Sequence, residues 1–169
     1  DEAVIDLKGG TTDLQSGSIS DNYFNATTAA GSEYDAILIE EIDEDDTDAE
    51  ISINDNTVLG ARDGIEILDT DSSNGGSITL NIQNNDIELL DGSDTPVAID
   101  ITAANLGDQA SNNQPVEVSI TGNTLLAESD DAERSANGID GLDDDNSGGS
   151  DLTITIEEND IDGFDTGLD

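Results

Sequence analysis

The sequence contains no cysteine, histidine, methionine or tryptophan in its 169 residues. The lack of cysteine excludes disulfides and thiol chemistry, and the lack of histidine removes the commonest general base and transition-metal ligand. No apolar run is long enough to cross a bilayer, and no signal peptide is visible. Any bound metal should therefore be a hard cation with oxygen ligands, such as calcium or sodium, rather than zinc or copper.

Basic residues are almost as scarce, since only Lys8, Arg62 and Arg134 stand against 42 acidic residues. A net charge of −39 excludes nucleic acid as a partner, because phosphate binding needs a basic face. It also disfavours anionic membrane surfaces. With only two tyrosines and two phenylalanines, the composition alone is compatible with a disordered acidic chain. A regular apolar pattern argues against disorder.

That pattern occurs five times along the chain. In each copy an asparagine is preceded, three residues earlier, by an isoleucine and followed, two residues later, by a large apolar residue. The asparagines are Asn22, Asn56, Asn85, Asn123 and Asn159, and the isoleucines are Ile19, Ile53, Ile82, Ile120 and Ile156. The spacings between asparagines are 34, 29, 38 and 36 residues. A repeat of this length, built on alternating apolar positions, indicates a solenoid.

Each repeat reads as a short series of strands. Apolar residues alternate with polar ones before the asparagine, which predicts a strand with one buried side. The asparagine tolerates the left-handed region, and we expect it to turn the chain. After a variable gap comes a second strand, predicted at 37–39, 65–67 and 99–101, with related elements at 139–141 and 5–7. Loops rich in Gly, Ser, Asn and Asp lead to the next copy.

Coils of this kind resemble the right-handed parallel β-helix family over the whole chain. The resemblance implies an all-β fold, a right-handed parallel β-helix (β-solenoid) of about five coils, as one domain over residues 1–169. It also implies that the five stacked asparagines form an internal hydrogen-bonded ladder. The alternative is that they are surface turn residues. The ladder is favoured because the fixed apolar positions on both sides leave little slack in register.

The two ends of the sequence read as parts of one coil. From Asn159 through the last residue and on to Asn22 of a second copy is 32 residues, within the range of the other spacings. We expect either tandem repeats of a longer protein or separate subunits that stack head to tail, with frayed ends as the alternative. The apolar residues at this joint would be Val4, Ile5, Leu7, Phe164 and Leu168.

Acidic residues gather in loops that follow the second strand, at 40–48, 69–74 and 143–151. One loop fits part of an EF-hand calcium loop, but Ile154 stands where its bidentate glutamate belongs. The candidate calcium ligands are Asp43, Asp45, Asp46, Asp48, Asp69, Asp71, Asp143, Asp145, Ser147 and Asp151. The alternative is a solvated acidic edge that is adapted to high salt and merely screened by cations.

Enzymes occur in the β-helix family, as polysaccharide lyases and hydrolases. A lyase would need a basic proton acceptor, and only Arg62 and Arg134 could serve. Carboxylate pairs for glycoside hydrolysis arise trivially among so many acids, and aromatic residues to stack on sugars are few. We therefore expect that the chain is not an enzyme.

The sequence instead predicts a structural role, as part of an extracellular or cell-surface filament, sheath or stalk. Its partners would be further copies of itself and cations, with calcium as the expected cofactor. The alternative is an adhesin or receptor-binding segment that uses the insertions at 25–36 and 102–115. Asn25 begins the one glycosylation sequon, which matters only in a secreted protein.

Overall fold

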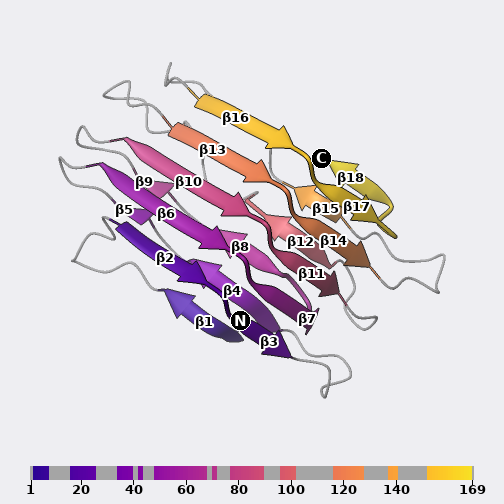
Figure 1. The fold of residues 1–169 in the computed structure, drawn as a ribbon. Helices are drawn as coiled ribbons and strands as arrows, with labels where there is room; N and C mark the ends of the chain where they lie inside the picture. The colour runs from indigo at the N-terminus through magenta and orange to yellow at the C-terminus, as the bar shows by residue number, and fades with distance from the viewer. Residues whose placement is uncertain are drawn as a thin grey trace.

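The structure is a computed structural model, and it describes residues 2–7, 16–25, 34–39, 42–43, 48–67, 70–71, 77–89, 96–101, 116–127, 137–140 and 152–168. The described residues form strands and turns, and none of them lies in a helix. The described residues therefore contain no helix that is long and apolar enough to cross a membrane. The strands belong to three long sheets and one short one (Figure 1).

The three long sheets, here called A, B and C, are built only of parallel neighbours. Sheet A contains β1 (Glu2–Leu7), β4 (Tyr34–Ile39), β8 (Ile65–Ile67), β12 (Val97–Asp100), β15 (Asn137–Asp140) and β18 (Thr166–Leu168). Sheet B contains β2 (Ser16–Ser20), β6 (Ala49–Asn54), β10 (Ile78–Gln83), β13 (Val116–Thr121) and β16 (Leu152–Glu157). Sheet C contains β3 (Tyr23–Asn25), β7 (Thr57–Ala61), β11 (Asp86–Leu89), β14 (Thr124–Ala127) and β17 (Asp160–Asp162).

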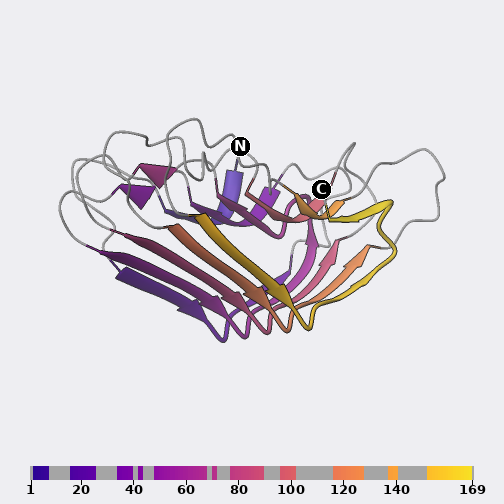
Figure 2. The ribbon, with the colours of Figure 1, turned by 90° about the horizontal axis from the view of Figure 1, so that it is seen from above.

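The chain visits the sheets in the order A, B, C and moves one strand along each sheet per circuit, which makes a β-solenoid of about five coils. Figure 2 looks down this stack, with the C-terminal coils nearest the viewer. The chain runs along sheet B, turns into sheet C and returns along sheet A, anticlockwise in this view. The solenoid is therefore right-handed, as predicted and as parallel crossovers normally are.

The predicted apolar positions pair with one another from coil to coil. In sheet B the five isoleucines that precede the asparagines form one row, Ile19, Ile53, Ile82, Ile120 and Ile156. In sheet C the matching row is Phe24, Val58, Ile87, Leu125 and Ile161. In sheet A it is Ile5, Ile37, Ile65, Ile99 and Ile139. The side chains of the inner coils are buried in one continuous core, so the predicted strands are confirmed.

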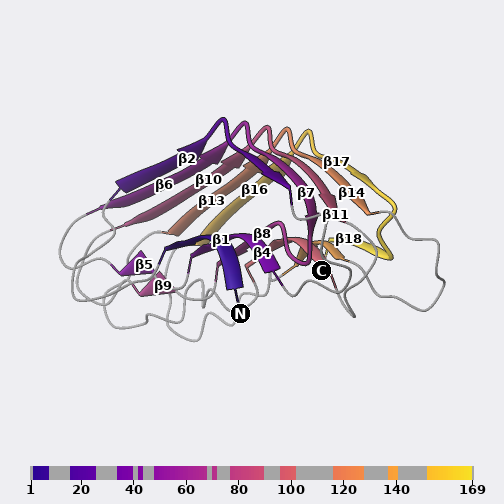
Figure 3. The same cartoon turned by 90° about the horizontal axis from the view of Figure 1, so that it is seen from below.

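The sharp corner between sheets B and C repeats along one ridge of the molecule (Figure 3). We expected the asparagine, which tolerates the left-handed region, to turn the chain there, but the asparagines of the repeat do not have a positive φ. The residue before each of them has one instead: Asp21, Asp55, Asn84, Gly122 and Glu158 have φ between 54° and 67°. This residue makes the turn, which leaves the asparagine side chain free to point inward.

The asparagines form the predicted ladder, and the surface-turn alternative is wrong. Each Nδ2 donates to the Oδ1 of the asparagine in the next coil, at 2.9–3.0 Å from Asn22 through to Asn159. The same Oδ1 accepts the backbone N–H of the previous asparagine. The other Nδ2 hydrogen reaches back to an isoleucine carbonyl of the previous coil, as from Asn85 to Ile53 at 2.8 Å. Every polar atom of the inner amides is thereby paired.

The core is less well covered at its two ends. Ile5 and Leu7 at one end, and Ile154, Ile156, Ile161 and Phe164 at the other, are only partly buried. Val4, Tyr23 and Leu168 are the exposed large apolar side chains of the described residues, at 59%, 64% and 51% exposure. All three belong to the outermost strands of their sheets. The residues that we assigned to the joint therefore do lie on the two end coils.

Candidate cation site

Most of the predicted calcium ligands, namely Asp45, Asp46, Asp69, Asp143, Asp145, Ser147 and Asp151, lie outside the described residues. Asp43 and Asp71 are register partners in the short sheet of β5 (Ile42–Asp43) and β9 (Thr70–Asp71). The two acidic segments that contain β5 and β9 therefore occupy equivalent positions in neighbouring coils. Asp48 is hydrogen-bonded within the chain to Ser77, 29 residues later. Its Oδ1 accepts the Ser77 N–H at 3.1 Å and the Ser77 Oγ–H at 2.8 Å.

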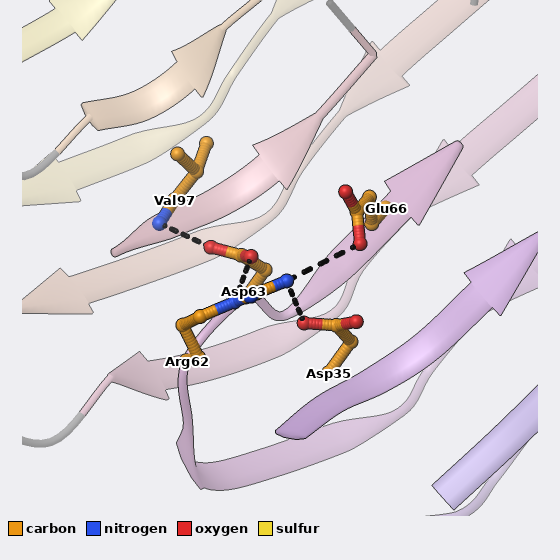
Figure 4. Close-up of polar contacts among 5 residues, drawn as sticks. All are labelled: Asp35, Arg62, Asp63, Glu66 and Val97. Atoms are coloured by element: carbon orange, nitrogen blue, oxygen red, sulfur yellow. Dashed lines mark hydrogen bonds and ion pairs between the residues drawn. The ribbon is translucent and has the colours of Figure 1, made fainter. Parts of the chain in front are cut away.

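A different group of carboxylates meets at the start of two strands of sheet A, as Figure 4 shows. Asp35 begins the buried part of β4, Asp63 precedes β8, and Glu66 lies within β8. One carboxylate oxygen from each of the three lies within 4.8 Å of the other two. Asp35 is fully buried and Asp63 is 5% exposed. We call these three residues the acidic triad.

Strand register explains how residues distant in sequence form the triad. Ile37 of β4 pairs with Ile65 of β8, so that Asp35 and Asp63, each two residues earlier, come to neighbouring positions. The connection from β7 to β8 is short, and Gly60, in β7 just before this connection, forms a bulge with φ 80°. A bulge bends the strand and redirects the residues that follow it. Arg62 and Asp63 are therefore placed at the corner, close to Asp35.

Arg62 occupies one side of the triad (Figure 4). Its guanidinium donates from Nη2 to Asp35 Oδ1 at 2.8 Å and from Nε to Asp63 Oδ2 at 2.6 Å. Nη2 also lies 3.6 Å from Glu66 Oε2, which is an ion pair without hydrogen-bond geometry. One guanidinium thus faces three carboxylates. When all are ionised, the group has a formal charge of −2.

The triad links three successive coils of sheet A. Asp35 comes from the coil of β4, and Asp63 and Glu66 come from the coil of β8. Asp63 Oδ1 accepts the backbone N–H of Val97, at the start of β12, at 2.8 Å. Hydrogen bonds to charged groups contribute more to stability than neutral ones. Loss of either carboxylate should therefore loosen the corner in more than one coil.

Burial shifts the protonation of these groups. Burial raises the pKa of Asp63 to about 6, although the Val97 N–H and Arg62 oppose the change. Burial, and next the charge of Asp35, raise the pKa of Glu66 from its ordinary 4.5 to about 7. Burial alone would lower the pKa of Arg62, but the attraction of Asp63 and Asp35 outweighs it and the net shift is upward. Arg62 is thus held in its charged form.

Two oxygens of the triad have no hydrogen-bond partner in the part of the chain that the structure describes. They are Asp35 Oδ2 and Glu66 Oε2, and both are buried. Figure 4 shows the free oxygen of Asp35 on the same side as the Glu66 carboxylate. Two facing carboxylate oxygens are both acceptors, so they need a proton or a cation between them. The donor set consists of hard oxygen ligands, which suits calcium rather than zinc or copper.

The acidic triad was not predicted from the sequence. Asp35 and Asp63 were not among the candidate ligands, because the candidates were taken from the acidic loops. Arg62 was considered only as a proton acceptor for a lyase. The usable signal was that two acids occupy the same position in neighbouring coils, with one of the chain's three basic residues beside them.

No family model matches the sequence, and no curated protein or solved structure matches the chain at a significant level. The description of the fold therefore rests on the strand pairing and on the asparagine ladder.

Proposed function

We propose that this chain is a structural unit of an acidic extracellular filament, sheath or stalk that extends by coil-on-coil stacking. The observation that supports this most is where the exposed apolar residues lie. In the described part of the chain, large exposed apolar side chains occur only on the outermost strands, at Val4, Tyr23 and Leu168. Apolar surface confined to such positions marks an interaction site.

The asparagine ladder favours a head-to-tail joint. It is polar, because every rung donates from Nδ2 toward the C-terminal end and accepts at Oδ1 from the N-terminal side. Among the described residues, nothing donates to Oδ1 of Asn22, and Asn159 has no further rung to which it can donate. A further coil placed in register would join Asn159 to Asn22. Two identical ends could not pair in this way.

The edges of the sheets support the same arrangement. The strands β1, β2 and β3 at one end, and β16, β17 and β18 at the other, each pair on one side only among the described strands. Unpaired parallel edges are templates for further strands. In register, Leu168 would lie next to Ile5, and Gly167 next to Val4. The further coil could belong to a second copy or to a tandem repeat.

The charge of the rod makes cations part of the proposal. Five coils at about 4.8 Å each advance about 24 Å. A net charge of −39 over that length exceeds the density of duplex DNA, which has one charge per about 1.7 Å. Bound or condensed cations, calcium in particular, would reduce this repulsion. Such a rod would suit an extracellular or cell-surface setting.

The two other function classes have less support. Arg62 is engaged by three carboxylates, which leaves it unsuited to act as the base of a lyase. Of the insertions that a receptor-binding segment would use, 25–36 and 102–115, residues 26–33 and the whole of 102–115 lie outside the described residues. A structural role is therefore our conclusion.

The proposal is tested by blocking the two ends separately. Val4→Lys and Leu168→Lys each place a charge on an exposed apolar end position, where a stacked coil would have to bury it. We expect the unmodified chain to form concentration-dependent assemblies in calcium-containing buffer. Each variant should need at least tenfold more protein to assemble. Sedimentation velocity measures this.

Glu117→Gln is the matched control, because it changes the net charge by the same amount at an exposed position of β13, in the middle of the stack. It should assemble like the unmodified chain. An unmodified chain that remains monomeric at all concentrations, or end variants that assemble as readily as the control, would contradict the proposal.

A further inference from the structure

We propose that the acidic triad of Asp35, Asp63 and Glu66 is a binding site for one calcium ion. This site lies within one chain and away from the end strands, so it does not depend on stacking. It also differs from the loop aspartates that the sequence analysis selected. The inference deepens the proposed role of calcium, but its test is separate from the test of assembly.

A cluster of carboxylates alone would be weak evidence on a chain this acidic. The second observation is Asp35 itself, whose side chain is fully buried and whose Oδ2 has no hydrogen-bond partner among the residues that the structure describes. Leaving a buried charged oxygen unpaired is costly, and native structures rarely do so without a bound water or ion. Among the described residues, Glu66 Oε2 is buried and lacks a hydrogen-bond partner as well, although it lies 3.6 Å from Arg62 Nη2. Both oxygens belong to the same small group.

The charge of the group suits a divalent ion. Arg62 satisfies Asp35 Oδ1 and Asp63 Oδ2, and the Val97 N–H satisfies Asp63 Oδ1. Three carboxylates and one guanidinium leave two negative charges uncompensated. A single calcium ion would neutralise them, whereas a sodium ion would leave one. Arg62 would remain as the fixed counter-charge on one side, and the ion would lie on the other.

The size of the group fits calcium. The three ligand oxygens lie within 4.8 Å of one another. Oxygen ligands at 2.3–2.6 Å from calcium can be separated by up to about 5 Å across the ion, and calcium accepts irregular geometry where magnesium demands a near-ideal octahedron. Calcium takes six to eight oxygens, so water must supply the rest. Glu66 and Arg62 are 13% and 23% exposed, which gives water access from their side.

A bound ion would act as a clamp between coils. Its ligands come from the coil of β4 and the coil of β8, and Asp63 also holds β12. An ion that binds only the folded state stabilises that state by mass action. The expected effect is a rise in unfolding temperature that saturates with calcium, unlike the gradual effect of screening.

The test uses the EDTA-treated chain and calcium itself, in a buffer whose potassium chloride screens the acidic surface. Calcium binding is measured by isothermal titration calorimetry, and the unfolding temperature is followed at each calcium concentration. We expect Asp35→Asn to lose one bound calcium ion per chain and the saturable part of the thermal shift. Glu66→Gln should lower the calcium affinity of the same site at least tenfold. This second variant keeps the test valid if Asp35→Asn fails to fold.

Glu117→Gln again serves as the control, since it removes one exposed carboxylate elsewhere. It should bind the same number of calcium ions as the unmodified chain. If the unmodified chain, Glu66→Gln and the control bind calcium identically, or if magnesium gives the same thermal shift as calcium in all of them, the site does not exist. The facing carboxylates would then share a proton. Assembly could still depend on the ends, so the two proposals fail separately.

Discussion

At the scale of single residues, the asparagine ladder lets a solenoid bury amides at a sharp corner. Asn56, Asn85 and Asn123 are each about 1% exposed, a position where an unpaired amide would be strongly destabilising. Each one gains bonds to both neighbouring coils. The ladder therefore fixes the register of the stack as well as the corner within each coil.

Replacing the central asparagine should show how much the ladder contributes. Asn85→Ala removes the acceptor of the Asn56 N–H and Nδ2 and the donor to Ile53 O and Asn123 Oδ1. We expect a loss of about 3 kcal/mol or more, because several buried polar groups are left unpaired. Urea denaturation measures the loss. Asn22→Ala, at the exposed end of the ladder, should cost only about 1 kcal/mol. Equal losses at the two positions would contradict the ladder as described.

The acidic triad predicts a dependence on pH in the absence of divalent cations. The pKa of Glu66 is raised to about 7 and that of Asp63 to about 6, so the folded state holds protons more tightly than the unfolded chain does. The stability that this contributes is complete below about pH 4 and is lost as the pH rises through 6 to 7. Glu66→Gln should flatten this fall.

The difference between the two profiles separates the triad from general charge repulsion. Allowing for solvent screening, we expect Glu66→Gln to reduce the loss of stability between pH 4.5 and pH 7.5 by on the order of 1 kcal/mol. The profile of Glu117→Gln should parallel that of the unmodified chain. If Glu66→Gln also gives a parallel profile, the assignment of the raised pKa to Glu66 is wrong. Denaturant unfolding at each pH in EDTA supplies the data.

At the scale of the elements, close packing between sheets A and C determines which residues can begin a sheet A strand. The position before the inward-facing Ile or Leu is Val4 in the first strand and then a small residue in each later one, Ala36, Gly64, Ala98, Gly138 and Gly167. A Cβ on Gly64 would lie 2.5 Å from the carbonyl oxygen of Ala98 and 2.6 Å from Ile87 Cγ2. Gly64 does not have a positive φ, so its backbone conformation does not require glycine. Glycine is needed here because there is no space for a Cβ.

This requirement gives a paired prediction for two equivalent glycines. Gly64→Ala should destabilise the chain by about 2 kcal/mol, since the new methyl group meets backbone that cannot easily move. At Gly167 in the last coil, the nearest atom to an added Cβ is 3.9 Å away, in ordinary contact. Gly167→Ala should therefore change stability by less than about 0.5 kcal/mol. Thermal unfolding of both variants tests the difference, and similar effects would contradict the packing described.

The strands could be predicted from sequence because their signal is local and repeated. The row of Ile19, Ile53 and Ile82 is marked by alternation within each copy and by a fixed distance to the asparagine. The left-handed residue could not be predicted as easily. Aspartate, asparagine, glycine and glutamate all occupy that position, so no single residue type marks it.

The acidic triad could not be predicted from the sequence for a different reason. Asp35 and Asp63 are 28 residues apart, and the local sign that sets them apart from the other 40 acids is weak, namely Arg62 directly before Asp63. Their meeting depends on the strand register of β4 and β8 and on the bulge at Gly60. Only the folded corner shows that two carboxylate oxygens have no hydrogen-bond partner among the described residues. The loop aspartates that resembled a calcium loop stay a prediction.

At the scale of the whole molecule, the chain is a charged rod of stacked coils, and the exposed large apolar side chains of its described residues lie on the end strands. The same parallel pairing that holds one coil to the next within the chain is available at both ends. An assembly made in this way would run head to tail and would grow without closing. Because the chain repels its copies, we expect growth to depend on cations.

The most direct test of this account is electron microscopy of the chain in calcium-containing buffer, combined with fibre diffraction of the aligned material. The account predicts thin fibres with a reflection at about 4.8 Å along the fibre axis, the spacing of stacked coils. Removal of calcium with EDTA at low salt should shorten them. Discrete particles one solenoid long, at every concentration and calcium level, would contradict end-to-end stacking.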